Sequence, residues 1–228
     1  MNVLNDIDTV FIRTIGERTT DACANRFKKA GFNIVLINKS PFWKALKKVY
    51  ELGSQCKKPW IAVCDADILP YMDKVIGFKS DTSNPVINTM SDDWILSGKP
   101  RQGGIKFYRT DMLKAFSHKI NQNTRRPEKY IIKAYVKIDK ITLGTHDKEQ
   151  WYRDVFRKVC HHQFKHPKYI TQAKPYWIKK LHEHDDFKVA LAALNNIKEF
   201  KYLDAKSFPD VTPLLSRLGL KEKRDYQE

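Results

Sequence analysis

Short apolar runs alternate with amphipathic stretches over the first 70 residues of the chain. The runs have the length and the β-branched content of strands, and the stretches between them repeat their apolar positions at helical spacing. The predicted strands cover 8–14, 32–38 and 60–64, and the predicted helices cover 19–30 and 40–53. This alternation predicts an α/β fold of the Rossmann-like type, a mostly parallel sheet with flanking helices.

The pattern is weaker in the middle of the chain. We expect strands at 85–90 and 105–110, with a loop over 98–104 between them and a short helix that Asp111 caps. Residues 131–144, IIKAYVKIDKITLG, alternate apolar and polar side chains. That alternation predicts an extended, hairpin-like stretch.

A helix is expected after Thr145, which has the features of an N-cap. Asp147 and Glu149 would then lie in the first helical turn, where the helix dipole favours acidic side chains. The residues that follow form one apolar stripe with a basic exposed side. The last 40 or so residues also have helical character. We therefore expect an α/β domain over 1–160 and a C-terminal helical annex over 161–228, packed on the same domain.

The charge of the chain is strongly uneven. The 228 residues carry a formal net charge of +16, yet residues 1–100 contribute only +3. Residues 125–180 hold 15 basic and 5 acidic side chains, a net charge of +10. A basic block of this kind is typical of proteins that contact a polyanion, either nucleic acid or an anionic membrane surface, although a basic face can also serve solubility alone.

The four cysteines are scattered and form no C-x-x-C pair. We interpret them as free thiols of a reducing compartment. No stretch approaches the roughly 20 apolar residues of a spanning helix, and the N-terminus lacks the pattern of a secretory signal. The expected location is the cytoplasm, or the host cytoplasm if the gene is carried by a phage.

The main chemical signal is the segment WIAVCDAD, residues 60–67. Five apolar residues predict a buried central strand, and Asp65 and Asp67 follow at its carboxyl end, where open α/β sheets bind ligands. Buried carboxylates are costly unless a partner stabilises them. A hard divalent cation is such a partner, and it usually completes its shell with water and substrate phosphates. The alternative is that both acids simply emerge into solvent.

Several common signatures are missing from the chain. It contains no G-x-G-x-x-G fingerprint and no G-x-x-x-x-G-K-[ST] loop, so a Rossmann dinucleotide site and a P-loop lack support. No Ser or Cys lies in a nucleophile elbow. The carboxylate pair is therefore the strongest guide to the chemistry.

The order of predicted elements, the Arg-Thr pair after the first strand and the DAD segment together resemble the GT-A glycosyltransferases. GGIKFYRTDML, residues 103–113, resembles the glycine-containing segment of that family near the donor sugar. THDKEQWYRDVFRK, residues 145–158, resembles its later acidic segment. The likeness covers roughly 8–160, and DAD is its one recognised short motif. It implies Mn²⁺ or Mg²⁺ on the diphosphate of a nucleotide-sugar, with a UDP-sugar as the expected donor.

The resemblance also implies roles for individual residues. The implied metal ligands are Asp65, Asp67 and His146, with His161, His162 and His166 as rivals to His146. The implied nucleotide-sugar contacts are Arg13, Thr14, Arg18, Asp65, Gly103 and Gly104. The acceptor contacts are expected at Asp92 and Asp93 and, in the basic block 125–180, at Arg125, Arg126, Lys129 and Arg153.

The catalytic base has two candidates. Asp147 is the first candidate and Glu149 the second, and helix-dipole complementation explains both acids equally well. The usual late motif of the family has a Glu-Asp pair where this chain has His-Asp. Both the base and the choice between an inverting and a retaining route therefore stay open.

The acceptor and the enzyme class have alternatives. The basic block suits DNA, and the chain resembles the soluble phage-type enzymes that glycosylate hydroxymethylated pyrimidines. Glycosyl transfer to lipopolysaccharide or another surface glycan at a membrane is the competitor, but the sequence predicts no long amphipathic helix with exposed Trp, Phe and Leu. A nucleotidyltransferase of the polymerase-β type fits the spacing of Gly53-Ser54 and DAD, although Pro59 leaves no room for its helix. A non-catalytic nucleic-acid-binding module is the third class.

Overall fold

A computed structural model describes residues 1–96, 99–124, 136–196 and 209–227 of the chain. They fall into two compact units. Unit 1 comprises 1–91 and 100–146, and unit 2 comprises 92–99 and 147–228. We had expected a division after residue 160. The boundary falls earlier because the helix over 152–165 packs with the C-terminal helices.

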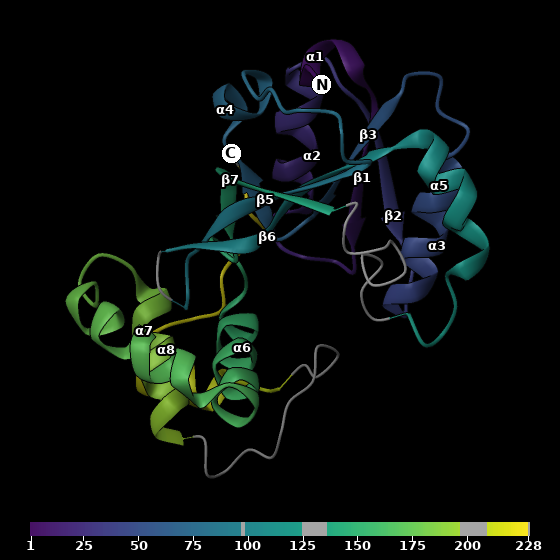
Figure 1. The fold of residues 1–228 in the computed structure, drawn as a ribbon. Helices are drawn as coiled ribbons and strands as arrows, with labels where there is room; N and C mark the ends of the chain where they lie inside the picture. Colours follow the sequence, from purple (N-terminus) through teal and green to yellow (C-terminus); the bar gives the residue numbers. More distant parts are fainter. Residues whose placement is uncertain (97–98, 125–135, 197–208, 228) are drawn as a thin grey trace. The chain divides into compact units, whose positions relative to one another are not determined.

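Unit 1 is a mixed α/β fold, which confirms the predicted fold class (Figure 1). Its helices are α1 (Val3–Asp6), α2 (Thr20–Lys29), α3 (Phe42–Gly53), α4 (Met72–Ile76), α5 (Thr110–Phe116) and the 3₁₀ helix η1 (Ser117–Lys119). Its strands are β1 (Ile7–Thr14), β2 (Asn33–Asn38), β3 (Trp60–Asp65), β4 (Ile68–Pro70), β5 (Val86–Asp93), β6 (Pro100–Arg109) and β7 (Val136–His146). The last two residues of β5 belong to unit 2.

The seven strands form one sheet in the order β2-β1-β3-β6-β5-β7-β4. The predicted β-α-β-α-β segment supplies its parallel part, since β1 pairs in parallel with both β2 and β3. The pairs β3–β6 and β4–β7 are antiparallel. The carboxyl ends of β1 and β3 consequently meet at one edge of the sheet, as the sequence predicts.

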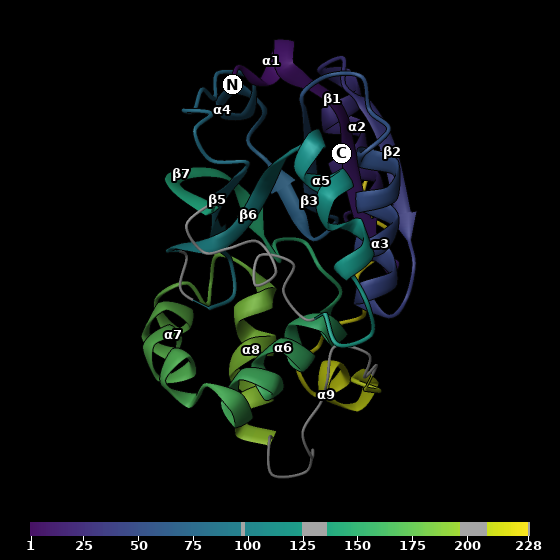
Figure 2. The same ribbon diagram turned by 45° about the vertical axis from the view of Figure 1, so that its right-hand side comes forward.

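Alternate residues of the central strands face opposite layers, as the pleat requires. Val10 of β1 and Cys64 of β3 lie in one core with Phe27 of α2. Phe11 and Val63, one residue away on the same strands, lie in a second core that contains residues of α3 and α5. Figures 1 and 2 show α3 and α5 side by side. Helices therefore cover both faces, and the apolar run of β3 is buried as predicted.

Two predictions about loops need correction. The loop expected over 98–104 is a strand from Pro100 onward, and residues 97–98 lie outside the described residues. A Cβ added to Gly104 would lie 2.4 Å from the carbonyl oxygen of Met90, so the glycine permits close pairing rather than a turn. The first five residues of the extended stretch predicted over 131–144 are also outside the described part.

The predicted N-cap at Thr145 is wrong. Pairing with β4 extends β7 through Thr145 to His146, so neither residue begins a helix. Asp147 and Glu149 then adopt positive φ angles of 60° and 62° in a turn. Such left-handed positions interrupt regular structure, and α6 begins only at Tyr152. The alternative that the two acids complement the helix dipole from the first turn of this helix is therefore wrong.

Unit 2 is helical, as predicted for the C-terminal annex. Its helices are α6 (Tyr152–Lys165), α7 (Pro167–Lys179), α8 (Asp185–Asn196) and α9 (Thr212–Arg217). Its core gathers apolar residues of all four around the buried Trp177 of α7, whose indole donates to the carbonyl of Ile95. Ile95 and Leu96 thus belong to this core, although more than 50 residues separate them from α6.

All four cysteines are free thiols, as predicted. No helix within the described ranges is long and apolar enough to cross a membrane.

Candidate functional site

Asp65 ends β3 and pairs with Arg13 near the end of β1. The two residues are direct partners in the parallel register, and Nη2 of Arg13 lies 2.7 Å from Oδ1 of Asp65. Arg13 is 8% exposed, and its guanidinium lies 4.6 Å from the ring centre of Phe42. The sequence predicted that both residues share this edge of the sheet, and the structure brings them into contact.

The turn between Asp65 and Asp67 is tied to its surroundings. The backbone N–H of Ala66 donates to the carbonyl of Arg13 at 2.9 Å. The hydroxyl of Thr19 donates to the carbonyl of Ala66 at 2.7 Å, and both Thr19 and Ala66 are fully buried. The two acids therefore stand on a backbone fixed by β1 and by the residue before α2.

Asp67 faces His146, the last residue of β7. In the antiparallel register His146 lies opposite Ile68, which directly follows Asp67. Nε2 of His146 is 3.2 Å from Oδ2 of Asp67. Gly144 makes this pairing possible, because a Cβ there would lie 2.8 Å from the carbonyl oxygen of Leu69. Two residues separated by almost 80 positions are thereby placed side by side in unit 1.

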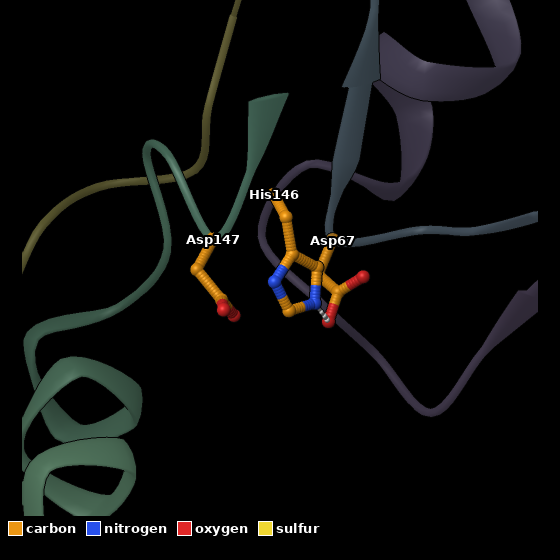
Figure 3. A group of neighbouring side chains, drawn as sticks. All are labelled: Asp67, His146 and Asp147. Carbon is orange, nitrogen blue, oxygen red and sulfur yellow. Dashed lines mark ion pairs between the residues drawn. The ribbon is translucent and has the colours of Figure 1, made fainter. Parts of the chain in front are cut away.

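Asp147 follows His146 directly, and the division between the units falls at their shared peptide bond. Its place beside His146 is therefore a matter of covalent geometry. Asp67, His146 and the next residue along the chain, Asp147, each offer one possible ligand atom (Figure 3). One nitrogen and two carboxylates form a donor set that Mn²⁺ accepts, whereas Mg²⁺ prefers oxygen ligands.

Glu17 is a site residue that the sequence analysis missed. It lies in the loop between β1 and α2, where its carboxylate accepts hydrogen bonds from Thr14 Oγ1 at 2.7 Å and the N–H of Ile15 at 2.8 Å. Burial raises the pKa of Glu17, and the negative charge of nearby Asp67 raises it further. Its position directly after the first strand was the available signal, but the neighbouring Arg13, Thr14 and Arg18 matched the family pattern and Glu17 did not.

The site has the features expected of a cation site. Oδ1 of Asp67 is buried and has no hydrogen-bond partner among the described residues. An acceptor without a donor is unfavourable inside a protein, and the charge of Glu17 nearby increases the negative potential. A divalent cation on Asp67 would relieve both effects.

Asp147 is also bound to Lys158 of α6, within unit 2. The ammonium group of Lys158 forms ion pairs with Asp147 and with Asp93, the latter at 3.0 Å. Burial alone would lower the pKa of Lys158, but the charges of Asp147 and Asp93 outweigh it, and the pKa is raised. The Lys158 ammonium therefore occupies the carboxylate of Asp147 in this structure, and the role of Asp147 as catalytic base stays a prediction.

Glu149 takes part in a separate network of unit 2. Its carboxylate lies 3.3 Å from Nε2 of His184 and 3.9 Å from the ammonium of Lys223. Lys223 also pairs at 2.6 Å with Asp186, which is fully buried. These contacts explain how Glu149 is held at a positive φ, and its role as second-choice base stays a prediction.

The remaining predicted residues are spread over both units. Thr14 lies at the site and fixes the loop of Glu17, and Arg18 follows in the same loop. Gly103 and Gly104 lie within β6. Asp93 is buried, and its carboxylate accepts from Leu96 N at 2.8 Å and from Lys158, contacts that favour a structural role over acceptor binding. Asp92 precedes it at the end of β5.

Other predicted contacts lie in unit 2 or outside the described residues. The Arg153 guanidinium lies 5.5 Å from the ring centre of Trp151. Arg125, Arg126 and Lys129 lie outside the described residues. His161, His162 and His166 form a ring cluster around the junction of α6 and α7, with centroids 5.3 and 5.9 Å apart along the series. Of the four candidate histidines, His146 is the one that contacts Asp67.

The chain is similar to solved structures of two enzymes at low sequence identity. No family model and no curated protein matches the sequence. Among solved structures, the chain is similar to a glycosyltransferase involved in the glycosylation of the major capsid of PBCV-1, with a TM-score of 0.42 and 12% identity, over 61% of this chain and 94% of the other. It is also similar to 4-diphosphocytidyl-2C-methyl-D-erythritol synthase from Anaerococcus prevotii, with a TM-score of 0.42 and 9% identity, over 65% and 91%. At such TM-scores neither match establishes the fold or the activity of this chain.

Proposed function

We propose that the protein is a metal-dependent glycosyltransferase of the GT-A type. It would move a sugar from a nucleotide-sugar to a hydroxyl acceptor. The class rests on the acid pair at the carboxyl end of β3, beside the end of β1, in a sheet whose first three strands are parallel. This is the edge at which open α/β sheets bind nucleotides.

The observation that carries the proposal is the environment of Asp67. One of its carboxylate oxygens contacts His146, and the other is buried with no hydrogen-bond partner among the described residues. Asp67 and His146 would hold the cation, with Asp147 as a further candidate ligand. When bound, the cation would supply positive charge for a leaving diphosphate.

Residues of unit 1 would orient the donor. Arg13 holds the Asp65 carboxylate through a parallel pair of strands, so Asp65 would be available to a ribose hydroxyl or to the cation without changing its position. Thr14 and Glu17 keep the loop after β1 closed by side-chain hydrogen bonds. That loop would border the nucleotide, as the sequence predicted for Thr14 and Arg18.

The acceptor and the base remain predictions from the sequence. The expected acceptor is a hydroxymethylated pyrimidine in DNA, with a surface glycan as the alternative. A base would take the proton of the acceptor hydroxyl in an inverting reaction. Asp147 and Glu149 both pair with cationic side chains of unit 2. A retaining reaction, which needs no such base, is therefore the alternative to the inverting reaction.

The test is a transfer assay with a panel of nucleotide-sugars and Mn²⁺. DNA that contains hydroxymethylcytosine and plain DNA serve as acceptors, and mass spectrometry of the digested nucleosides reports a gain of one sugar. Released nucleoside diphosphate indicates glycosyl transfer, and released pyrophosphate from a nucleoside triphosphate indicates nucleotidyl transfer. The proposal expects metal-dependent release of nucleoside diphosphate from at least one donor, whether or not DNA accepts the sugar. Pyrophosphate as the only product, or full activity in EDTA, would refute it.

A further inference from the structure

Unit 2 carries a long segment without acidic side chains. Between Asp154 and Glu183 the sequence contains no Asp or Glu, but it contains seven Lys and Arg residues. The segment covers most of α6 and all of α7. Five of its basic residues are lysines beyond the first two turns of α6: Lys165, Lys168, Lys174, Lys179 and Lys180. A surface of this composition attracts anions without competition from its own carboxylates.

Apolar side chains are exposed within the same segment. Ile178 of α7 is 54% exposed, and Phe164 at the end of α6 is 50% exposed. The apolar residues that build the core from α7 are Ile170, Ala173 and Trp177, and Ile178 points away from them. Solvent exposure of two large apolar side chains is unfavourable by itself. Each is followed directly in the sequence by a lysine, Lys165 or Lys179, so one partner with apolar and anionic groups would satisfy both.

A groove of about 630 Å³ lies over the same helices of unit 2. Its apolar lining comes from α7 and α8, and two lysines stand at it. The residues that matter here are Ile170, Pro175, Ile178, Leu194, Lys174 and Lys179. Neither Lys174 nor Lys179 forms an ion pair with another described residue. The groove therefore offers apolar contact beside two cationic groups.

We infer that unit 2 docks on an anionic lipid bilayer through the groove lined by Ile178, Lys174 and Lys179, with the exposed Phe164 at the end of α6 as a further apolar contact. Headgroup phosphates would meet the lysines, and the apolar groups would enter the boundary between headgroups and acyl chains. The phosphates of DNA would pair with the lysines. They would leave Phe164, Ile178 and the apolar groove exposed to water, because a phosphate contact does not bury an apolar side chain. The sequence alone does not identify this face, because it does not show which apolar residues of α6 and α7 stay exposed to solvent after the helices pack.

This inference goes beyond the proposed function and does not depend on it, because binding is measured without metal, donor or acceptor. The experiment is flotation of the full chain with vesicles of phosphatidylcholine alone, and with vesicles that contain about 30 mol% phosphatidylglycerol. Binding should need the anionic lipid and weaken as salt rises. The double variants Phe164→Ser/Ile178→Ser and Lys174→Gln/Lys179→Gln should each lower the partition coefficient on anionic vesicles about tenfold.

Matched variants in unit 1 serve as controls. Leu36→Ser removes an apolar side chain of similar exposure, 48%, from β2, and Lys28→Gln/Lys29→Gln removes two exposed lysines from the end of α2. Both should bind like the wild type, and circular dichroism checks that every variant is folded. Absence of binding to anionic vesicles would overturn the inference. So would duplex DNA binding that needs Lys174 and Lys179 but not Phe164 and Ile178, combined with vesicle binding that neither double variant changes.

Discussion

Two pairs of aspartates follow strands of the same sheet, and they have different surroundings. Asp65 and Asp67 stand at the end of β3, whereas Asp92 and Asp93 end β5. The side chain of Asp67 is 24% exposed, and one of its oxygens is buried with no hydrogen-bond partner among the described residues. The side chain of Asp93 is 4% exposed, and it accepts hydrogen bonds from a backbone N–H and from Lys158.

Position at the end of a strand therefore does not by itself identify a ligand site. Asp93 accepts hydrogen bonds from two donors of its own unit, Leu96 N and Lys158 of α6, so its hydrogen-bonding capacity is met without a ligand. Asp67 has one carboxylate oxygen without a hydrogen-bond donor among the described residues and lies near Glu17, and we propose that a cation binds there. Unsatisfied hydrogen-bonding capacity, rather than acidity, separates the two.

The largest expected effect tests Asp67. Asp67→Asn should lower the rate of sugar transfer about a thousandfold, because the cation loses a charged ligand. Its melting temperature should stay within about 2 °C of the wild type, since the side chain lies outside both cores. Steady-state kinetics and calorimetry on the same preparations measure the two quantities.

Asp93→Asn should give the reverse result. Its melting temperature should fall by several degrees, while transfer at a temperature well below the transition stays within about threefold of the wild type. If Asp93→Asn abolishes transfer in a protein that is still folded, the earlier prediction that Asp93 binds the acceptor gains support and the comparison fails.

The next effect concerns Lys158. Lys158→Met removes the cation between Asp93 and Asp147, whose side chains are 4% and 14% exposed. Leaving buried carboxylates without their partner costs about 3–5 kcal/mol of unfolding free energy. The loss should appear in the urea transition that includes the helical unit 2, followed by far-ultraviolet circular dichroism. A loss below about 1 kcal/mol would mean that the ion pairs are not structural.

The pH dependence of this pair follows from its sign. The pKa of Lys158 is raised in the folded protein, so its contribution to stability is fully present below the unfolded pKa. It disappears only as the pH rises through the folded value. The difference in the free energy of unfolding between Lys158→Met and the wild type should therefore become smaller only in strongly alkaline solution. Urea titrations across the alkaline range can follow this difference.

The smallest expected effect concerns Glu17. Its pKa is raised, so its ionised form costs stability once the pH has passed from the ordinary value through the raised one. Glu17→Gln should raise the melting temperature of the metal-free protein by about 2 °C at neutral pH, and by less in acid, where the wild-type carboxyl is protonated. Saturating Mn²⁺ should reduce this gain, because the cation offsets the same repulsion. An equal gain with and without Mn²⁺ would separate Glu17 from the cation site.

The sequence predicted much of unit 1 because local patterns determine its first half. Apolar runs and helical spacing located β1 to β3 with α2 and α3, and that order fixed the meeting of Arg13 with Asp65. The family resemblance implied both Asp67 and His146 as metal ligands, but the local patterns could not predict their direct contact. That contact depends on the antiparallel register of β4 and β7 and on Gly144, which are long-range features. The left-handed turn at Asp147 was missed because a short acidic segment after Thr145 also matches a helix start.

Mn²⁺ binding, measured by electron paramagnetic resonance with and without a nucleoside diphosphate, tests directly whether Asp67 holds a divalent cation. We expect the wild type to bind Mn²⁺, and to bind it more tightly with the nucleotide present. Asp67→Asn should lose this binding, and Asp93→Asn should keep it. Wild-type affinity in Asp67→Asn, under conditions where circular dichroism shows the native fold, would contradict this expectation.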